Sequence, residues 1–291
     1  MKLVALACLV LLIAPAAVAG EVEILVVGDS KPYAEAARAA AQALGTGTQP
    51  TTLAAAAPLP AAWSLEPPRA IIAVGARAVR LALKLPGTKV VAAMVLQETA
   101  ELQNPRAVAV PLAVPVERQL VLLGKLAPHA RRVGVVIDPR HSAAAVAEAR
   151  AEAGKHKLEL VVREVASDAE VSVAFAQLLP QVDAVLLVAD TTVVKREVIE
   201  LLVERSRALR VPVIGYSAAV VQAGLLAGYA VEPTENGAVA AMVARALLTD
   251  QGPSEAKVRG RLHLNLGTAR AIGVVVPADL TTAPTQVYPQ R

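Results

Sequence analysis

Short runs of consecutive apolar residues alternate with stretches of helical periodicity along nearly the whole chain. The runs predict strands at residues 22–27, 70–74, 89–94, 132–137, 158–165, 184–188 and 211–214, and the stretches predict helices at 32–44, 76–83, 142–155, 169–179 and 193–209. Strands that are apolar throughout are typical of parallel sheets covered by helices on both faces. The pattern therefore predicts an α/β fold.

The series of strands and helices occurs twice, and the two occurrences resemble each other. Residues 23–29 (EILVVGD) open the first series and residues 132–138 (RVGVVID) open the second. Between the series, the segment 110–115 contains two prolines, and the residue before each proline is restricted to extended backbone. We expect two lobes, each a mostly parallel sheet flanked by helices, with the chain crossing between them at this segment.

The segment 45–68 departs from this alternation. It is rich in Thr, Ala and Pro, and its periodicity is limited to a short strand-like stretch near residues 51–53. We interpret it as a loosely ordered surface connection. Trp63, the only tryptophan, suits a packing anchor for this connection better than a ligand-stacking residue.

The N-terminus has the pattern of an export signal. Met1 and Lys2 precede an apolar run over residues 3–13, and Ala17-Val18-Ala19 is a cleavage pattern of small residues. The run is shorter than the ~20 residues of a membrane anchor. We therefore expect a signal peptide at 1–19 and a periplasmic protein. Lipidation of Cys8 is the less favoured alternative, because cleavage before it leaves almost no apolar run.

Composition narrows the class of protein. The chain has 55% apolar residues, 19% charged residues and a net charge of +4, which excludes a disordered chain. The small charge excess and the 2% aromatic content argue against a nucleic-acid partner. Cys8 is the only cysteine, so a chain cleaved after Ala19 has neither a disulfide nor a thiol nucleophile.

Polar and small residues follow the predicted strands, at the positions where parallel α/β sheets bind ligands. The candidate ligand-binding residues are Asp29, Ser30, Gly75, Ala76, Gln97, Asp138, Asp190, Thr191, Tyr216 and Ser217. Hydroxyls, backbone N–H groups and a few carboxylates suit a small polar ligand, especially one whose carboxylate meets a helix N-terminus.

Several of these positions also fit structural roles. Asp190 precedes two threonines, so it suits either a ligand ammonium or a helix N-cap. Ser142 and Ser217 fit N-caps better than ligand contacts. Tyr33 and Tyr216 lie near predicted strand ends, where either a pocket or ordinary packing is consistent with the sequence.

No motif supports catalysis. The four histidines lack metal-ligand spacing, and Gly28 belongs to neither a dinucleotide fingerprint nor a phosphate loop. Asp138 and His141 lie close together in sequence, without a serine in a nucleophile elbow. We expect a protein that is not an enzyme and needs no cofactor or metal; an exported enzyme using Asp138, His141 or Asp190 is the rival hypothesis.

The second half of the chain resembles a known family. Residues 182–190 (VDAVLLVAD), 211–214 (VPVI), 224–229 (GLLAGY), 236–238 (NGA) and 264–277 (LNLGTARAIGVVVP) resemble the second lobe and closing segment of ABC-transporter substrate-binding proteins. The resemblance covers about residues 110–277. It implies the type I periplasmic binding protein fold, with two α/β lobes joined by three crossing strands, and relates the chain to members that bind aromatic amino acids.

The first lobe departs from the family. Residues 94–99 read MVLQET where members have a Thr-Asp-Pro-like loop, and 45–68 replaces much of the usual first-lobe sequence. Only Asp190 and the Tyr216-Ser217 loop match the family's binding positions. The ligand therefore does not transfer with the resemblance.

The resemblance implies a monomeric, exported solute-binding protein that captures a small polar ligand, such as an amino acid or a carboxylate, and delivers it to an ABC permease. The expected lobes are 20–111 with 231–255 and 112–230 with 256–291. A periplasmic sensor or assembly partner that keeps the fold without transport is the alternative.

Overall fold

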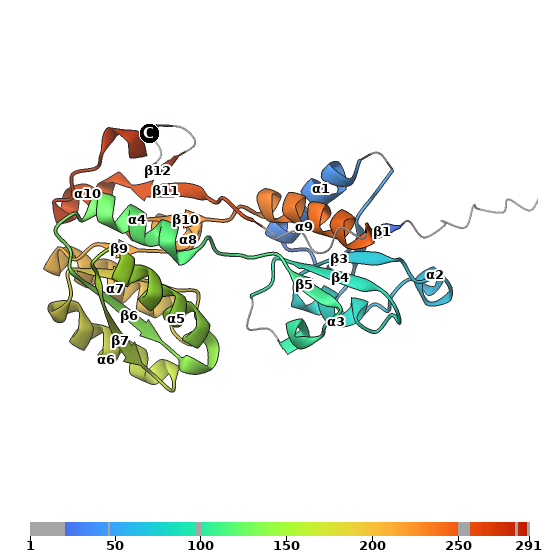
Figure 1. The fold of residues 1–291 in the computed structure, drawn as a ribbon, viewed down its shortest axis with the longest axis horizontal. Helices are drawn as coiled ribbons and strands as arrows, with labels where there is room; N and C mark the ends of the chain where they lie inside the picture. Colours follow the sequence, from blue (N-terminus) through green and yellow to red (C-terminus); the bar gives the residue numbers. More distant parts are fainter. Residues whose placement is uncertain (1–20, 46, 97–99, 250–256, 283–284, 290–291) are drawn as a thin grey trace, which may run out of the picture.

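The computed structural model describes residues 21–45, 47–96, 100–249, 257–282 and 285–289. They form two α/β lobes that lie end to end along the longest axis of the molecule (Figure 1). Each lobe is built on one sheet, so the predicted two-lobed α/β architecture is confirmed. The expected signal peptide lies outside the described residues.

The first lobe contains a sheet of five parallel strands in the order β2-β1-β3-β4-β5. The strands are β1 (Val22–Val27), β2 (Thr51–Leu53), β3 (Ala70–Val74), β4 (Lys89–Ala93) and β5 (Ala107–Ala109). The helices are α1 (Lys31–Leu44), α2 (Ala61–Leu65), α3 (Ala76–Ala82), the 3₁₀ turn η1 (Ala100–Gln103) and α9 (Pro233–Leu248). Helices α1 and α9 cover one face of the sheet, whereas α2 and α3 cover the other.

The second lobe contains a seven-stranded sheet in the order β12-β11-β10-β9-β8-β6-β7. The strands are β6 (Arg132–Ile137), β7 (Glu159–Glu164), β8 (Ala184–Leu186), β9 (Val213–Ile214), β10 (Ala227–Ala230), β11 (Arg261–Asn265) and β12 (Gln286–Tyr288). Only the β10–β11 pair among them is antiparallel.

Helices cover both faces of this second sheet. They are α4 (Val116–Leu126), α5 (Pro139–Lys155), α6 (Asp168–Leu178), η2 (Leu179–Gln181), α7 (Arg196–Leu209), α8 (Ala218–Gln222), α10 (Leu266–Ile272) and η3 (Ala278–Leu280). Helices α4, α5 and α10 pack on one face, and α6, α7 and α8 pack on the other. Fully buried strands between two helical layers explain the uninterrupted apolar runs in the sequence.

The segment 45–68 is more ordered than its composition predicts. It contains the edge strand β2 and the short helix α2. Trp63 of α2 is 5% exposed and packs with Leu25, Ile71 and Val79. The interpretation of Trp63 as a packing anchor is therefore confirmed, whereas the loose surface connection is corrected: burial of one large aromatic side chain holds the segment on the sheet.

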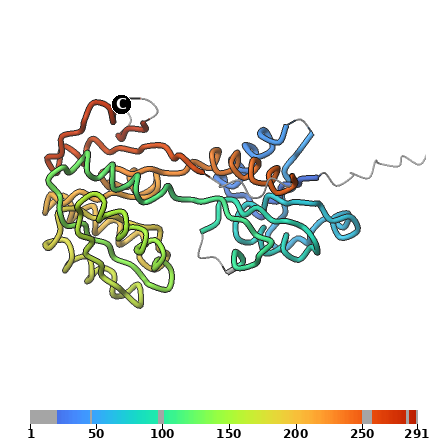
Figure 2. Tube along the Cα trace, viewed as in Figure 1, coloured from blue at the N-terminus to red at the C-terminus, as the bar shows by residue number. Residues whose placement is uncertain are grey.

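The chain passes between the lobes at 110–115, at 231–232 and at 257–260, and Figure 2 shows these connections between the lobes. They run close together, because a Cβ on Gly260 would lie 2.5 Å from Val114 Cγ1 and 3.2 Å from the Ala230 oxygen. The Glu235 carboxylate on α9 accepts hydrogen bonds from the Arg259 and Gly260 amides. Helix α9 thereby holds the third connection in place.

A buried chain of hydrogen bonds joins the second connection to the C-terminal strand. His263 on β11 is 3% exposed; its Nε2 lies 2.9 Å from Glu232 Oε1 and its Nδ1 lies 2.9 Å from the Tyr288 hydroxyl. Because a carboxylate only accepts, Nε2 carries the proton and Nδ1 accepts from Tyr288. The Tyr288 oxygen in turn accepts from Gln222.

Close packing of α1 and α9 is directly testable. A Cβ on Gly237 would lie 1.9 Å from the Ala36 carbonyl oxygen, so Gly237→Ala has to push the two helices apart. We expect the free energy of unfolding to fall by about 1–3 kcal/mol in urea titrations. Gly124→Ala on α4 is the control: apart from the neighbouring backbone of α4, no atom lies within 4 Å of the added Cβ, and replacing a helical glycine should stabilise the fold by roughly 0.5–1 kcal/mol. Equal effects of both substitutions would contradict this account.

Acid should weaken the fold through His263. Burial lowers the pKa of its imidazole, Glu232 opposes this, and Arg261 adds to the lowering. The unfolded chain therefore binds the proton more tightly, and stability falls as the pH drops below the unfolded value of about 6.5. The free energy of unfolding, measured from about pH 7 to about pH 5, should show this loss. In His263→Gln the free energy should depend less steeply on pH, although this variant should be about 1–3 kcal/mol less stable at neutral pH. Parallel curves for both proteins would argue against this role.

Candidate functional site

Each lobe has a rim of loops that follow the carboxyl ends of its parallel strands. In the first lobe these loops follow β1, β3 and β4; they contain the predicted residues Asp29, Ser30 and Gly75, and the predicted Ala76 is the first residue of α3. In the second lobe they follow β6, β7, β8 and β9, and they hold Asp138, Asp190, Thr191, Tyr216 and Ser217. The predicted Gln97 lies outside the described residues.

Asp190 is the centre of the second rim. Its side chain is 1% exposed, and its Oδ2 accepts from the Asp138 amide and the Ser142 hydroxyl, both at 2.8 Å. Its Oδ1 accepts from the amides of Thr192 and Val193, at 2.9 and 3.1 Å. These four donors occupy the four acceptor positions of a carboxylate. Asp190 therefore fastens the loop after β8 to the loop after β6.

Asp138 makes a second buried link. It is the N-cap of α5 and accepts from the Arg140 amide at 3.0 Å, which explains why this helix begins before residue 142. The carboxylate also accepts from Arg140 Nε and Nη2 and, at 2.9 Å, from the Thr192 hydroxyl. The Arg140 guanidinium is the largest reason that the pKa of Asp138 lies well below its usual range.

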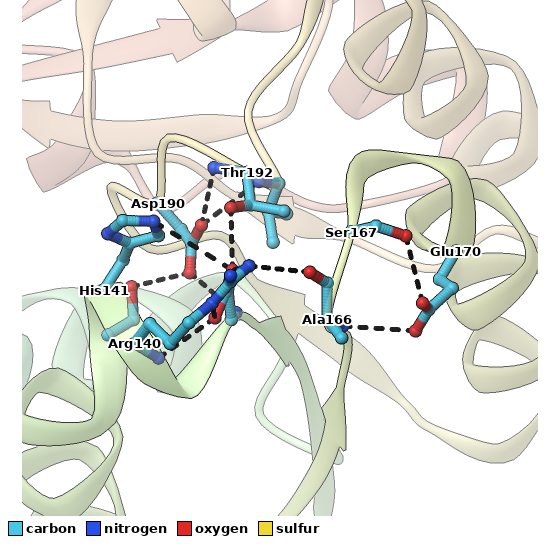
Figure 3. Close-up of polar contacts among 10 residues, drawn as sticks. Arg140, His141, Ala166, Ser167, Glu170, Asp190 and Thr192 are labelled. Carbon is cyan, nitrogen blue, oxygen red and sulfur yellow. Dashed lines mark hydrogen bonds and ion pairs between the residues drawn. The ribbon is translucent and has the colours of Figure 1, made fainter.

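The loop after β7 joins the same network (Figure 3). Arg140 Nη2 donates to the Ala166 carbonyl at 2.6 Å. Glu170, in the first turn of α6, accepts from the Ala166 amide and the Ser167 hydroxyl, at 3.1 and 3.0 Å. Three loops of the second rim are thus fixed relative to one another by side chains.

Other groups on the second rim have no such bonds. The hydroxyls of Thr191, Tyr216 and Ser217 make no hydrogen bond to the described residues, and Ser217 precedes α8 without a side-chain cap. Ser142, in contrast, bonds to Asp190 instead of capping a helix. Burial, and to a lesser extent Asp190, raise the pKa of the Tyr216 phenol. Tyr216 stays a neutral donor at physiological pH.

The first rim is built around Tyr33. Its ring lies against Gly75, where a Cβ would be 2.6 Å from Tyr33 Cε2 and where φ is +88°. Ser30 precedes α1 and makes no side-chain cap bond, and Asp29 is exposed. The sequence prediction left Tyr33 undecided between pocket and packing. The half-buried Tyr33 packs its ring against the loop after β3.

The loop after β4 is fastened to the hinge. The Met94 amide donates to Asn236 Oδ1 at 2.8 Å, and Asn236 Nδ2 donates to the Pro111 carbonyl at 3.0 Å. Asn236 is fully buried on α9. One amide side chain therefore links the first rim, the first connection and α9.

The described residues contain no group of three or more metal-ligating side chains and no helix with the length and apolar character of a membrane span. A surface hollow of about 480 Å³ lies beside the second rim and is lined by residues of β6, α5 and β7, including Ile137, Pro139 and Glu164.

Arg140 is the rim residue that the sequence prediction omitted. Residues two apart do not face each other on a helix. Asp138, however, lies outside the helix as its N-cap, and this lets the two side chains meet. An Asp-Pro-Arg sequence at a helix start is the signal that indicates such a pair.

Comparisons with solved structures agree on the fold. A ligand-free, open substrate-binding protein with adhesive properties from Clostridium difficile matches with a TM-score of 0.72 and 16% identity, over 94% of this chain and 100% of that one. A Streptococcus pneumonia ABC domain in complex with L-Trp matches with a TM-score of 0.63 and 16% identity, over 92% of this chain and 99% of that one. Both therefore share the overall fold of this chain.

Sequence comparison identifies the protein family. No curated protein sequence matches the chain significantly. A family model described as "ABC transporter substrate binding protein" matches residues 85–288, from the approach to β4 through β12. This match covers most of the chain, and the fold around it is the one that the solved substrate-binding proteins have. The chain therefore belongs to the ABC transporter substrate-binding protein family.

Proposed function

We propose that this protein is an exported solute-binding protein that captures a small polar ligand between its two lobes and delivers it to an ABC permease. The observation that carries the proposal is the pair of polar rims beside three closely spaced connections. Such connections allow hinge closure, in which the ligand is held by groups from both lobes. The proposed lobes are 20–111 with 231–255 and 112–230 with 256–291, and the protein acts as a monomer in the periplasm without catalysis.

The chemistry of the rims favours a ligand that carries a carboxylate. Asp138 and Asp190 use their oxygens on internal donors, so neither has an acceptor position left for a ligand ammonium. The groups that remain are the exposed cations Lys31 and Arg77, the hydroxyls of Ser30, Thr191, Tyr216 and Ser217, which can each donate, and one exposed carboxylate, Asp29, on the first rim. Donors of this kind suit a carboxylate or other anionic oxygen.

Two tyrosines suit the apolar part of such a ligand. Tyr33 belongs to the first rim and Tyr216 to the second, and both rings are half-buried. An aromatic ring buries a large area and keeps a polar hydroxyl for orientation. Amino acids with large side chains and aromatic carboxylates are therefore the first compounds to test.

Closure supplies the signal to the permease. A ligand shifts the lobes toward the closed form only as far as it binds that form more tightly. Contacts to both rims exist together only when the lobes are closed, so they provide this difference in affinity. The permease then distinguishes loaded from empty protein by lobe orientation.

One observation favours a second function. The family match begins at residue 85 and leaves β1, β2 and β3 outside it. A first lobe altered in this way suits a periplasmic sensor or assembly partner that keeps the fold without transport. Under that function, a ligand-binding cleft is dispensable.

A thermal-shift screen against amino acids, small carboxylates, amines and sugars tests the proposed function. A ligand at ~100 times its dissociation constant should stabilise the folded protein by about 2.7 kcal/mol. We expect the carboxylate-containing compounds to give the shifts, without any conversion of the compound. A screen with no shift in any class would favour the sensor or assembly partner.

Substitutions on the second rim should separate folding from binding. Asp190→Asn places an amide N–H₂ against one pair of buried donors, so we expect about 1–3 kcal/mol of lost stability. Tyr216→Phe removes a hydroxyl without a partner among the described residues and should leave the unfolding midpoint unchanged while weakening the ligand found in the screen. The opposite result would contradict this prediction: Asp190→Asn as stable as wild type, and Tyr216→Phe less stable than wild type.

A further inference from the structure

Arg140 differs from the other exposed basic side chains because a buried acid fixes it. Its side chain is 66% exposed, whereas the Asp138 carboxylate beneath it is 1% exposed. Nε of Arg140 lies 2.9 and 3.1 Å from the two Asp138 oxygens. An exposed arginine ordinarily samples many rotamers, and immobilising it on binding costs affinity. Here the fold has already restricted the side chain.

The bonds of Arg140 use only one edge of the guanidinium. Nε and Nη2 donate to Asp138, and Nη2 also donates to the Ala166 carbonyl at 2.6 Å. A guanidinium has five N–H donors, and Nη1 carries two of them. The described residues offer Nη1 no acceptor within hydrogen-bonding distance, so these two donors are available on the solvent side.

The carboxylates around Arg140 do not compete for those donors. Asp190 accepts from three backbone amides and the Ser142 hydroxyl, whereas Asp138 accepts from the amide, Nε and Nη2 of Arg140 and from the Thr192 hydroxyl. Ala166, the third partner, is itself held by Glu170. The guanidinium is therefore presented in a fixed position at the head of α5, with its free edge away from the acids that hold it.

We propose that Arg140 is the carboxylate anchor of the ligand site and that Asp138 positions it. This inference rests on the proposed function and deepens it, because it assigns one residue to the acidic group of the ligand. Nη1 donates to a carboxylate oxygen of the bound solute, and the neighbouring rim hydroxyls complete its hydrogen bonds. The amide of the same solute offers one neutral oxygen instead of two charged ones and binds more weakly.

The test uses matched probes: L-tryptophan, L-glutamate, benzoate and succinate, each beside its amide, titrated into the purified protein by calorimetry. Wild-type protein should prefer at least one acid over its amide. Arg140→Gln should weaken that acid at least ~10-fold and bind the amide as wild type does, so the preference disappears. Arg140→Lys should fall between them, since lysine keeps the charge but not the planar fork.

Two further variants separate anchoring from folding. Arg205→Gln removes the same charge from an exposed position near the far end of α7 and should bind like wild type. Asp138→Asn keeps Arg140 but weakens the hydrogen bonds that hold its side chain. If this variant folds, its preference for the acid over the amide should therefore be smaller than that of wild type. Arg140 is exposed, so its variants test the anchor even if Asp138→Asn fails to fold.

Each outcome decides one of the two proposals. An Arg140→Gln variant that keeps the wild-type preference for the acid overturns the anchor and leaves the solute-binding function intact. Binding of amides as tightly as acids, or of uncharged probes only, does the same. A thermal-shift screen in which no class of compound binds wild-type protein overturns the solute-binding function and the anchor with it.

Discussion

The contact between α9 and α1 is the one on which the two-lobed arrangement depends. The chain completes β6 to β10 in the second lobe and then returns to cover the first sheet with α9. Gly237 allows the α9 backbone to lie directly against the Ala36 carbonyl. Without this return, the first sheet would have one face only partly covered and the lobes would be joined by a single segment. Three neighbouring connections restrict the lobes to hinge motions, which one flexible linker does not.

Buried charge gives the second rim its shape. A carboxylate without water is costly unless hydrogen bonds satisfy it. The donors for Asp138 and Asp190 come from the loops after β6 and β8, and Arg140 extends the network to the loop after β7. These bonds form together only when the three loops adopt one arrangement. The rim is therefore set before a ligand arrives, and binding costs less conformational entropy on this side.

The strands were predictable because their signal is local. Runs of apolar residues define β1, β3 and β6 with the bounds that the structure has. Helix starts were less predictable: α7 begins at Arg196 rather than residue 193, because Asp190 holds the preceding turn through the amides of Thr192 and Val193. Similarly, the order of the segment 45–68 depends on where Trp63 packs, which the local composition does not reveal.

The placement of the rim residues at strand ends was predictable, whereas their hydrogen-bond partners were not. The rule that ligands bind at strand ends placed Asp190 on the rim, yet two of its donors lie 52 and 48 residues away, on Asp138 and Ser142. Only the folded chain shows that these donors leave no acceptor for a ligand. Arg140 was missed for the same reason, since its support includes the Ala166 carbonyl 26 residues away. The role of a rim residue depends on its tertiary contacts, whereas its position on the rim follows from the strand that precedes it in the sequence.

The two rims make different contributions to closure under the proposed function. Contacts to a rim that is already fixed are available in the open and closed forms alike, so they add affinity without favouring closure. The contacts that favour closure must come from the other rim, where Ser30 and Tyr33 have side chains without hydrogen-bond partners among the described residues. This is also the lobe whose first three strands lie outside the family match. The family match includes every helix and strand of the second lobe but only β4, η1, β5 and α9 of the first. Under the proposed function, the rim of the first lobe therefore determines which solute closes the two lobes.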